Sequence, residues 1–319
     1  MQTMIVQQAV AEALAEEMRR DPRVVMFGEG VATKRPELLA EFGAERVRNT
    51  PLAEAIITGT AVGAAAMGLR PVVDLLFAPF LTLSMDALIN SAGKLRYLSG
   101  GQFSFPLVVL AMSGAGWGVG GQHNHNLEAM FVHAPGLKVV MPATARDAKG
   151  LLAEAIRDPD PVLFCEPLRG YRLISDEVPE EDYTVELGRA RVAREGTDLV
   201  IVAYSAAVVV AEQAAERAAE EGYSVGVLDL RSLVPLDVDA LREAVAACGR
   251  AVVLHEGSLS AGFGAELVAT IQEEAFFSLH APIGRVAAYD TPYPPGTVED
   301  RYVPSVDRVL AAVRAALEG

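Results

Sequence analysis

The sequence predicts an α/β fold with two open, mostly parallel sheets flanked by helices. Short apolar runs alternate with helical patterns along nearly all of the 319 residues, which is typical of consecutive strand and helix units. The composition is 51% hydrophobic, with Ala, Val and Leu prominent, as buried parallel strands require. The alternation is lost at residues 168–190, which carry an acidic cluster. This break predicts a linker between a first domain at residues 1–185 and a second domain at 190–319.

The first domain is expected to begin with a helix at residues 3–19, because apolar side chains recur there at helical spacing. A strand at 24–27 then leads to the segment 28–30. Another helix is predicted to start with Thr50 as its N-cap and Pro51 at its first position. The same reasoning predicts strands at 72–76, 106–112, 137–141 and 161–165, and helices at 82–98 and 145–157.

The second domain repeats this alternation. Its expected strands lie at residues 199–202, 224–228, 251–254 and 285–288, and its helices at 206–221, 238–247, 264–274 and 306–317. The prolines within 291–295 prevent a continuous helix there. The chain is long enough for both domains to bury sizeable cores.

Charge and cysteine usage exclude several classes of protein. The net charge of -15 argues against a nucleic-acid partner, since phosphate backbones require Lys and Arg. No apolar run approaches the roughly 18 residues of a membrane span, and no signal peptide is visible at the start. Cys165 and Cys248 lie far apart in the sequence, which indicates reduced thiols in a cytoplasmic protein.

The most informative segment is residues 114–142, where a glycine-dense loop follows an apolar strand. It contains His123, His125 and His133, out of only 5 histidines in the chain, and we expect a helix to carry them. Open α/β sheets bind their ligands at the carboxyl ends of strands, and imidazole titrates near neutral pH. The segment therefore predicts a ligand site with proton chemistry.

A metal site is a weaker interpretation of these histidines. His123 and His125 are two residues apart and do not share a helical face. No CxxC or HExxH spacing supplies further ligands. Histidines held by local hydrogen bonds remain an alternative, but the neighbouring glycines allow the backbone to approach a ligand closely.

Three further side chains are candidates. Glu54, among apolar neighbours near a predicted helix start, is either a first-turn carboxylate favoured by the helix dipole or a desolvated group that can hold a proton. Glu29 follows a strand between two glycines, and Phe80 follows another strand together with Phe77. Such residues are more often core than ligand contacts. The sequence has no Walker loop, no GxGxxG that opens a helix after the first strand, and no GxSxG elbow, so this chain alone is poorly equipped to hold a diphosphate.

Several ordered motifs occur along essentially the full length of the chain. They are RVVMFGE at 23–29, NTPLAE at 49–54, GLRPV at 68–72, LRYLSGGQ at 95–102, HAPGLKVV at 133–140 and YVP at 302–304. With these motifs the chain resembles the beta subunit of the thiamine diphosphate-dependent decarboxylating component of 2-oxo acid dehydrogenase complexes, which act on pyruvate, branched-chain 2-oxo acids or acetoin.

The resemblance implies an α2β2 heterotetramer with active sites between alpha and beta subunits. In the family the alpha subunit carries the motif for Mg²⁺ and diphosphate, and this chain has no magnesium motif. Glu54 matches the glutamate that hydrogen-bonds the pyrimidine ring nitrogen and promotes the imino form. Phe80 matches the aromatic residue near that ring, and Glu29 and Leu52 match other positions of its pocket.

His123 matches the family's active-site histidine, which assists transfer of the acyl group to lipoyl-lysine. The family usually has His-Ser-Gln here, whereas this chain has His123-Asn124-His125, so His125 replaces an amide. Some members bind K⁺ through backbone carbonyls at positions matching Ala155, Ile156, Asp158 and Asp160. The second domain resembles the transketolase C-terminal domain, which in the family helps to dock the lipoyl acyltransferase core.

Three alternatives accompany this interpretation. A self-sufficient transketolase-like enzyme would need its own diphosphate and magnesium motif. An acetoin dehydrogenase beta subunit would differ only in substrate. A catalytically silent assembly subunit would have no use for Glu54 and His123 at their expected places.

Overall fold

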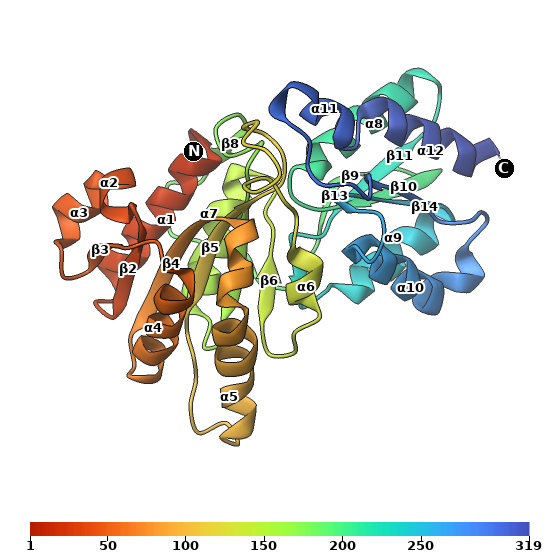
Figure 1. Cartoon of the computed structure of the whole chain (residues 1–319). Coiled ribbons are helices and arrows are strands. Elements are labelled where there is room, and N and C mark those ends of the chain that lie inside the picture. Colours follow the sequence, from red (N-terminus) through yellow and green to blue (C-terminus); the bar gives the residue numbers. More distant parts are fainter. Residues whose placement is uncertain (319) are drawn as a thin grey trace.

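The computed structural model describes residues 1–318 and confirms the predicted α/β class (Figure 1). The first sheet consists, in spatial order, of β12 (Ser232–Val234), β6 (Lys138–Val140), β7 (Val162–Pro167), β5 (Val108–Ser113), β4 (Arg70–Phe77), β2 (Val24–Glu29) and β3 (Val47–Thr50). The second sheet consists of β14 (Gly284–Ala288), β13 (Ala251–Ser258), β10 (Leu199–Ala203), β11 (Val225–Asp229) and β9 (Arg191–Arg194). A small antiparallel pair joins β1 (Gln2–Ile5) to β8 (Ser175–Val178).

Helices connect these strands. They are α1 (Val6–Arg20), α2 (Val31–Lys34), α3 (Pro36–Phe42), α4 (Glu54–Ala66), α5 (Gly93–Leu98), α6 (Glu128–Val132), α7 (Ala145–Arg157), α8 (Ala207–Glu220), α9 (Val238–Cys248), α10 (Phe263–Ala275), α11 (Glu299–Tyr302) and α12 (Val306–Glu318). A 3₁₀ segment, η1 (Ala78–Ser84), and a π-helical segment, η2 (Asp86–Ala92), precede α5. Short 3₁₀ turns lie at Phe276–Ser278 and Gly296–Val298. No helix within residues 1–318 is long and apolar enough to cross a membrane.

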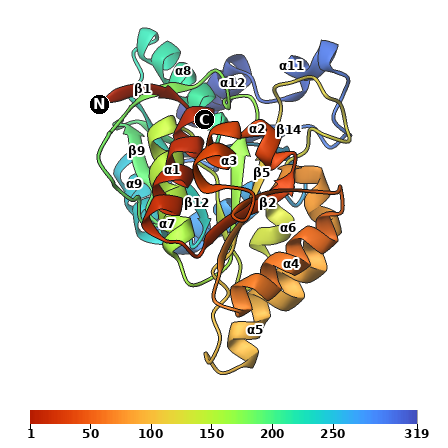
Figure 2. The same cartoon turned by 90° about the vertical axis from the view of Figure 1, so that its left-hand side faces the viewer.

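Two helical layers cover the first sheet. One core contains α1 and α7 packed on side chains such as Val72 and Leu110, while another contains α4 and η2 packed on Val73 and Val109. These strand residues alternate, as expected for a strand whose successive side chains point to opposite faces. Figure 2 shows α1 beside α7, away from α4 and α5.

The second sheet is covered in the same way. Its outer face packs against α8 and α12, and its inner face shares one continuous core with the α4 side of the first sheet. Because the two sheets share a core, the loops of one domain can reach those of the other.

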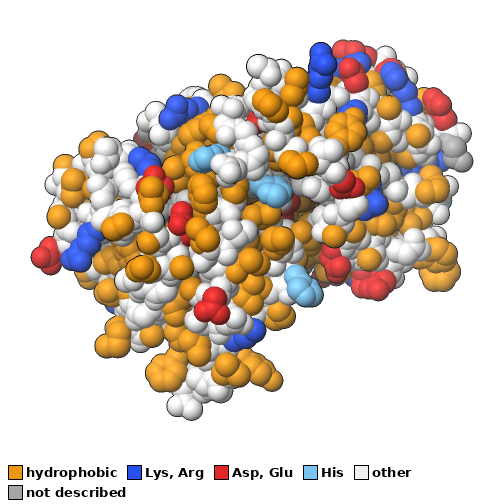
Figure 3. Space-filling model, in the orientation of Figure 1, with side chains coloured by type: hydrophobic (Ala, Val, Ile, Leu, Met, Phe, Trp, Pro, Cys, Tyr) orange, Lys and Arg blue, Asp and Glu red, His pale blue; other side chains and the backbone are white. Residues whose placement is uncertain are grey.

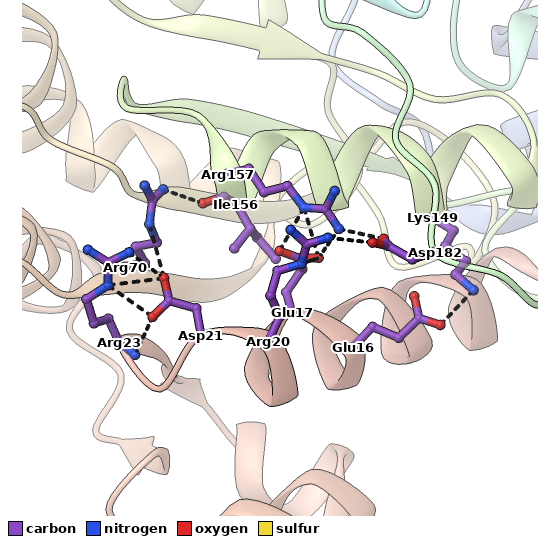
Figure 4. A network of polar contacts seen from close by, with 10 residues as sticks. All are labelled: Glu16, Glu17, Arg20, Asp21, Arg23, Arg70, Lys149, Ile156, Arg157 and Asp182. Atoms are coloured by element: carbon purple, nitrogen blue, oxygen red, sulfur yellow. Dashed lines mark hydrogen bonds and ion pairs between the residues drawn. The ribbon is translucent and has the colours of Figure 1, made fainter.

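Ion pairs fix α1 against α7 (Figure 4). Arg157 contacts Glu17 at 2.6 Å and Asp182 at 2.6 Å. The Nζ of Lys149, which is almost completely buried, lies 2.8 Å from Glu12 and 3.0 Å from Glu16. Buried charges need partners of this kind, because removing one would leave the other desolvated and unpaired.

Several predicted boundaries are wrong for identifiable reasons. The helix predicted from residue 3 begins at Val6, because residues 2–5 pair with β8 as a strand. That pairing also places a strand inside the predicted linker. The predicted helix at 82–98 is split among η1, η2 and α5. The short strands β3, β9 and β12 were not predicted, and β12 from the later half of the chain completes the edge of the first sheet.

Candidate functional site

The parallel strands β3, β2, β4 and β5 end at one edge of the first sheet. Glu29 is the last residue of β2 and pairs with Thr50, the last residue of β3. Glu29 ends β2. The segment after β3 carries Leu52 and Glu54, the segment after β4 carries Phe80, and the segment after β5 carries His123. The fold therefore brings every predicted catalytic or cofactor-binding side chain to the edge where open α/β sheets bind ligands.

Glu54 is the first residue of α4, and Ala53 precedes the helix as a cap residue without a side-chain hydrogen bond. The predicted N-cap at Thr50 is wrong, because Thr50 still belongs to the paired strand β3. The Glu54 side chain is partly buried, and its charge lies at the helix end that favours anions. The Glu54 carbonyl accepts a 3.0 Å hydrogen bond from the Ser84 Oγ, which fixes α4 to η1.

The His123 imidazole lies against two aromatic rings. Its ring centroid is 5.1 Å from that of Phe77 and 5.4 Å from that of Phe80, in both cases edge to face. This geometry restricts the orientation of the imidazole while leaving it partly exposed. Two sequence candidates, Phe80 and His123, thus lie against each other, and Phe77 packs edge-on against the same imidazole.

The predicted helix carrying three histidines is wrong. Only residues 128–132 form a helix, α6, and residues 114–127 form a loop. The loop turns at Gly120, whose carbonyl accepts hydrogen bonds from the backbone N–H groups of His123 and Asn124. His125 is exposed and its ring lies 6.4 Å from that of Tyr293. Within residues 1–318, no group of three or more His, Cys, Asp and Glu side chains could hold a metal ion.

The outer face of α4 is apolar and open. Leu52 is 69% exposed and Ile56 is 71% exposed, and hydrophobic side chains gather over α4 and α5 in the space-filling view (Figure 3). Large exposed apolar areas in soluble proteins usually mark an interaction surface. The candidate site therefore borders a surface suited to a protein partner.

Buried charges beneath the site were missed by the sequence analysis. Asp74, inside β4, and Glu166, near the end of β7, interact with the buried Arg35. Burial raises the pKa of Glu166 to about 7, against the opposing effect of Arg35. The sequence did contain a signal for these buried charges, namely a carboxylate inside an otherwise apolar strand. Such residues are rarely buried without a partner.

Two family models match the chain: the transketolase pyrimidine binding domain over residues 2–172 and the transketolase C-terminal domain over residues 188–309. The chain is 43% identical over 318 residues to the 2-oxoisovalerate dehydrogenase subunit beta of Bacillus subtilis, with 97% of each protein covered. It is 42% identical over 324 residues to the pyruvate dehydrogenase E1 component subunit beta of Staphylococcus aureus, with 100% of each covered. The chain belongs to the family of 2-oxo acid dehydrogenase beta subunits.

Solved structures agree with the two-domain transketolase-like fold. A split-gene transketolase, described as an inactive β4 tetramer, matches with a TM-score of 0.82 and 26% identity, covering 99% of this chain and 98% of that one. A transketolase from Leishmania mexicana matches with a TM-score of 0.75 and 18% identity, covering 100% of this chain and 46% of that one. The second likeness supports the fold alone.

The carbonyls suggested for potassium in this beta-subunit family member lie at the end of α7. Arg70 Nη1 donates a 2.7 Å hydrogen bond to the Ile156 carbonyl and a 3.2 Å bond to that of Asp158 (Figure 4). A guanidinium thus already interacts with two of the four predicted ligands, although each carbonyl has a second lone pair. The potassium site with Ala155, Ile156, Asp158 and Asp160 stays a prediction.

Proposed function

We propose that this chain is the beta half of a cytoplasmic thiamine diphosphate-dependent 2-oxo acid dehydrogenase. With an alpha subunit, in an α2β2 heterotetramer, it would decarboxylate a 2-oxo acid such as pyruvate or a branched-chain analogue and transfer the acyl group to lipoyl-lysine of an acyltransferase core. The observation that carries the proposal is His123 packed on Phe80 at the sheet edge that it shares with Glu54.

The side chains at this edge fit half of the cofactor. A partly buried carboxylate, an aromatic ring and an exposed leucine (Glu54, Phe80 and Leu52) suit an aminopyrimidine, which needs one hydrogen-bond partner and apolar contacts. A diphosphate would need cations. Lys34 lies 3.7 Å from Asp74 and Arg35 is 5% exposed, so we assign the diphosphate and its Mg²⁺ to the alpha subunit.

Two side chains of this chain, Glu54 and His123, would then take part in the reaction. When bound, thiamine diphosphate supplies the electron sink that decarboxylation requires. The Glu54 carboxylate would hold a proton at a pyrimidine ring nitrogen and orient the ring. The hydrogen bond that the Glu54 carbonyl accepts from Ser84 fixes the backbone from which this side chain extends.

His123 would act when the acyl group moves to the lipoyl disulfide. One sulfur takes the acyl group, the S–S bond breaks, and the other sulfur must receive a proton to become a thiol. An imidazole can serve as the donor of such a proton, and that of His123 is partly exposed. Contacts with Phe77 and Phe80 would limit rotation of the His123 imidazole and so keep its proton-donating nitrogen in one orientation.

The test is co-expression of this chain with the alpha subunit of the same organism, followed by assays across a panel of 2-oxo acids and acetoin. Turnover of a 2-oxo acid that requires thiamine diphosphate supports the proposal. Turnover of acetoin instead would make the chain an acetoin dehydrogenase beta subunit. Absence of any turnover in the purified, cofactor-loaded complex would favour the silent assembly subunit.

Glu54→Gln and His123→Gln separate the two roles. We expect Glu54→Gln to lower all turnover by about 100-fold or more. His123→Gln should lower transfer to a lipoyl domain by about 100-fold while sparing decarboxylation measured with an artificial electron acceptor. Glu37→Gln is the matched control, because Glu37 is an exposed first-turn carboxylate of α3.

A further inference from the structure

The loop that carries His123 is held by a segment from the other domain. We name residues 293–299, which lead from β14 into α11, the C-terminal strap. Figure 1 shows this blue segment beside the yellow loop that follows β5. The two segments are separated by about the whole second domain in the sequence, and they meet at several points.

The central contact is made by Glu299. Its Oε1 accepts a 3.0 Å hydrogen bond from the Gly116 backbone N–H and a 2.9 Å hydrogen bond from the Asn124 Nδ2. Glu299 is 7% exposed and Asn124 is completely buried. One carboxylate oxygen therefore closes the loop between residues 116 and 124. Hydrogen bonds to an ionised acceptor are stronger than neutral ones, and this one is largely shielded from water.

Asn124 connects Glu299 to the turn that contains the neighbouring His123. Its Nδ2 also donates a 2.9 Å hydrogen bond to the Gly114 carbonyl, and its backbone N–H donates to the Gly120 carbonyl at 2.9 Å. The backbone of His123 donates to the same Gly120 carbonyl at 3.1 Å. The position of the His123 backbone is thus set by the turn that Asn124 and Glu299 secure.

Two other contacts of the strap support the same loop. The Tyr293 hydroxyl donates a 3.0 Å hydrogen bond to Asn126 Oδ1. Gly118 and Gly296 approach so closely that a Cβ on Gly296 would lie 2.7 Å from the Gly118 Cα. Any larger residue would push strap and loop apart, so glycine at these positions serves the approach itself.

We propose that Glu299 is a positioning residue for His123: through Gly116 and Asn124, the second domain sets the orientation of the active-site imidazole. This inference rests on the proposed function for the role of His123. It assigns the C-terminal strap a role in catalysis through its contacts with the loop.

The test combines a structural and a kinetic measurement. Trp117, the one tryptophan of the chain, lies in this loop directly after Gly116, with its ring edge-on to Phe77 at 6.2 Å. Acrylamide quenching of its fluorescence in the purified full chain reports loop mobility without any need for activity. The rate of lipoyl-domain acylation in the complex with the alpha subunit reports the positioning of His123.

We expect Glu299→Ala to raise the Trp117 quenching constant about two-fold. It should also lower kcat for lipoyl acylation by about 10- to 100-fold, with KM for the 2-oxo acid within about two-fold, because small misplacements of a catalytic group are costly. Glu299→Gln can still present an oxygen to both donors and should restore both values to near wild type. Asp307→Ala is the control, since Asp307 pairs with Arg217 inside the second domain.

If Glu299→Ala does not fold, Glu299→Asp replaces it, because aspartate keeps the charge but cannot reach both donors. Unchanged quenching and unchanged acylation in the folded variant would overturn the inference. So would equal losses in the Ala and Gln variants, since Gln preserves the acceptor. A wild-type complex that never acylates a lipoyl domain would refute the proposed function instead, and the quenching result would still decide whether Glu299 fixes the loop.

Discussion

The Tyr204 hydroxyl donates a 2.8 Å hydrogen bond to the Glu128 Oε1, and both side chains are buried where the two sheets share their core. Tyr204 follows β10 of the second sheet and Glu128 opens α6 of the first domain. Burial raises the pKa of Glu128, and the hydrogen bond from Tyr204 opposes that rise. The bond therefore stabilises a polar contact between the domains directly below the His123 loop.

Tyr204→Phe should destabilise the folded chain by about 1–3 kcal/mol, because it leaves a buried carboxyl without its donor. Urea unfolding of the purified chain measures this loss. Tyr97→Phe is the control, since Tyr97 is exposed, and it should change the free energy of unfolding by less than about 0.5 kcal/mol. Equal stability of the two variants would mean that the hydrogen bond contributes nothing net.

A second buried carboxyl makes stability depend on pH. Glu256 lies in β13 close to the loop residues Gly114 and Ala115, and burial raises its pKa to about 7 from 4.5, although Arg169 and the Ala115 N–H oppose the rise. The folded state thus favours the protonated form. Its stabilising contribution is complete below about pH 4.5, and it is lost as the pH rises through about 7.

Glu256→Gln should remove this dependence, since the amide does not ionise. Relative to wild type, we expect the variant to gain stability as the pH rises, by up to about 3 kcal/mol above pH 7. Urea unfolding at several pH values between 5 and 8 measures the difference, and Glu37→Gln serves as the exposed control. A difference that stays constant over this range would refute the assignment.

Gly28 allows β2 to pass close to β4 just before Glu29. Its φ is +152°, and a Cβ there would lie 2.2 Å from the Asp74 carbonyl oxygen. Gly28→Ala should therefore cost more than about 2 kcal/mol of stability, since the clash is with backbone. Gly63→Ala is the matched control: it lies in α4 with nothing within 4 Å of its Cβ and should stabilise the helix by about 0.5–1 kcal/mol. Thermal unfolding of the two variants separates the effects, and equal melting temperatures would contradict this interpretation.

Much of this fold follows from local sequence. Buried parallel strands such as β5 and β10 are continuous apolar runs, and α7 and α8 have clear helical spacing, so their types were predictable. The strands β1, β8 and β12 were not, because each exists only through pairing with a segment far away in the chain. The sequence Thr50-Pro51 is typical of a helix start, but pairing with β2 extends the strand β3 through Thr50.

The residues of the candidate site also divide into those that local sequence predicts and those that it does not. His123 and Glu54 were predicted as site residues because they follow strand ends and match positions of the family's motifs. Glu299 and Tyr293 were not, because the sequence does not reveal that the strap returns to a loop in the first domain. Contacts between distant segments depend on how two domains pack, and no local period or spacing records that packing.

The apolar face of α4 gives the last prediction. Ile56 lies two residues after Glu54 in the first turn of α4 and is 71% exposed, and Leu52 just before the helix is 69% exposed. If the alpha subunit covers this face, a charge at Ile56 would be buried without a partner in the complex, which costs several kcal/mol. Ile56→Asp should then prevent co-purification of the alpha subunit while leaving the melting temperature of the isolated chain within about 2 °C. Val192→Asp, an exposed position on β9, should leave the complex intact in size-exclusion chromatography with light scattering. A full-sized complex with Ile56→Asp would mean that the partner binds elsewhere.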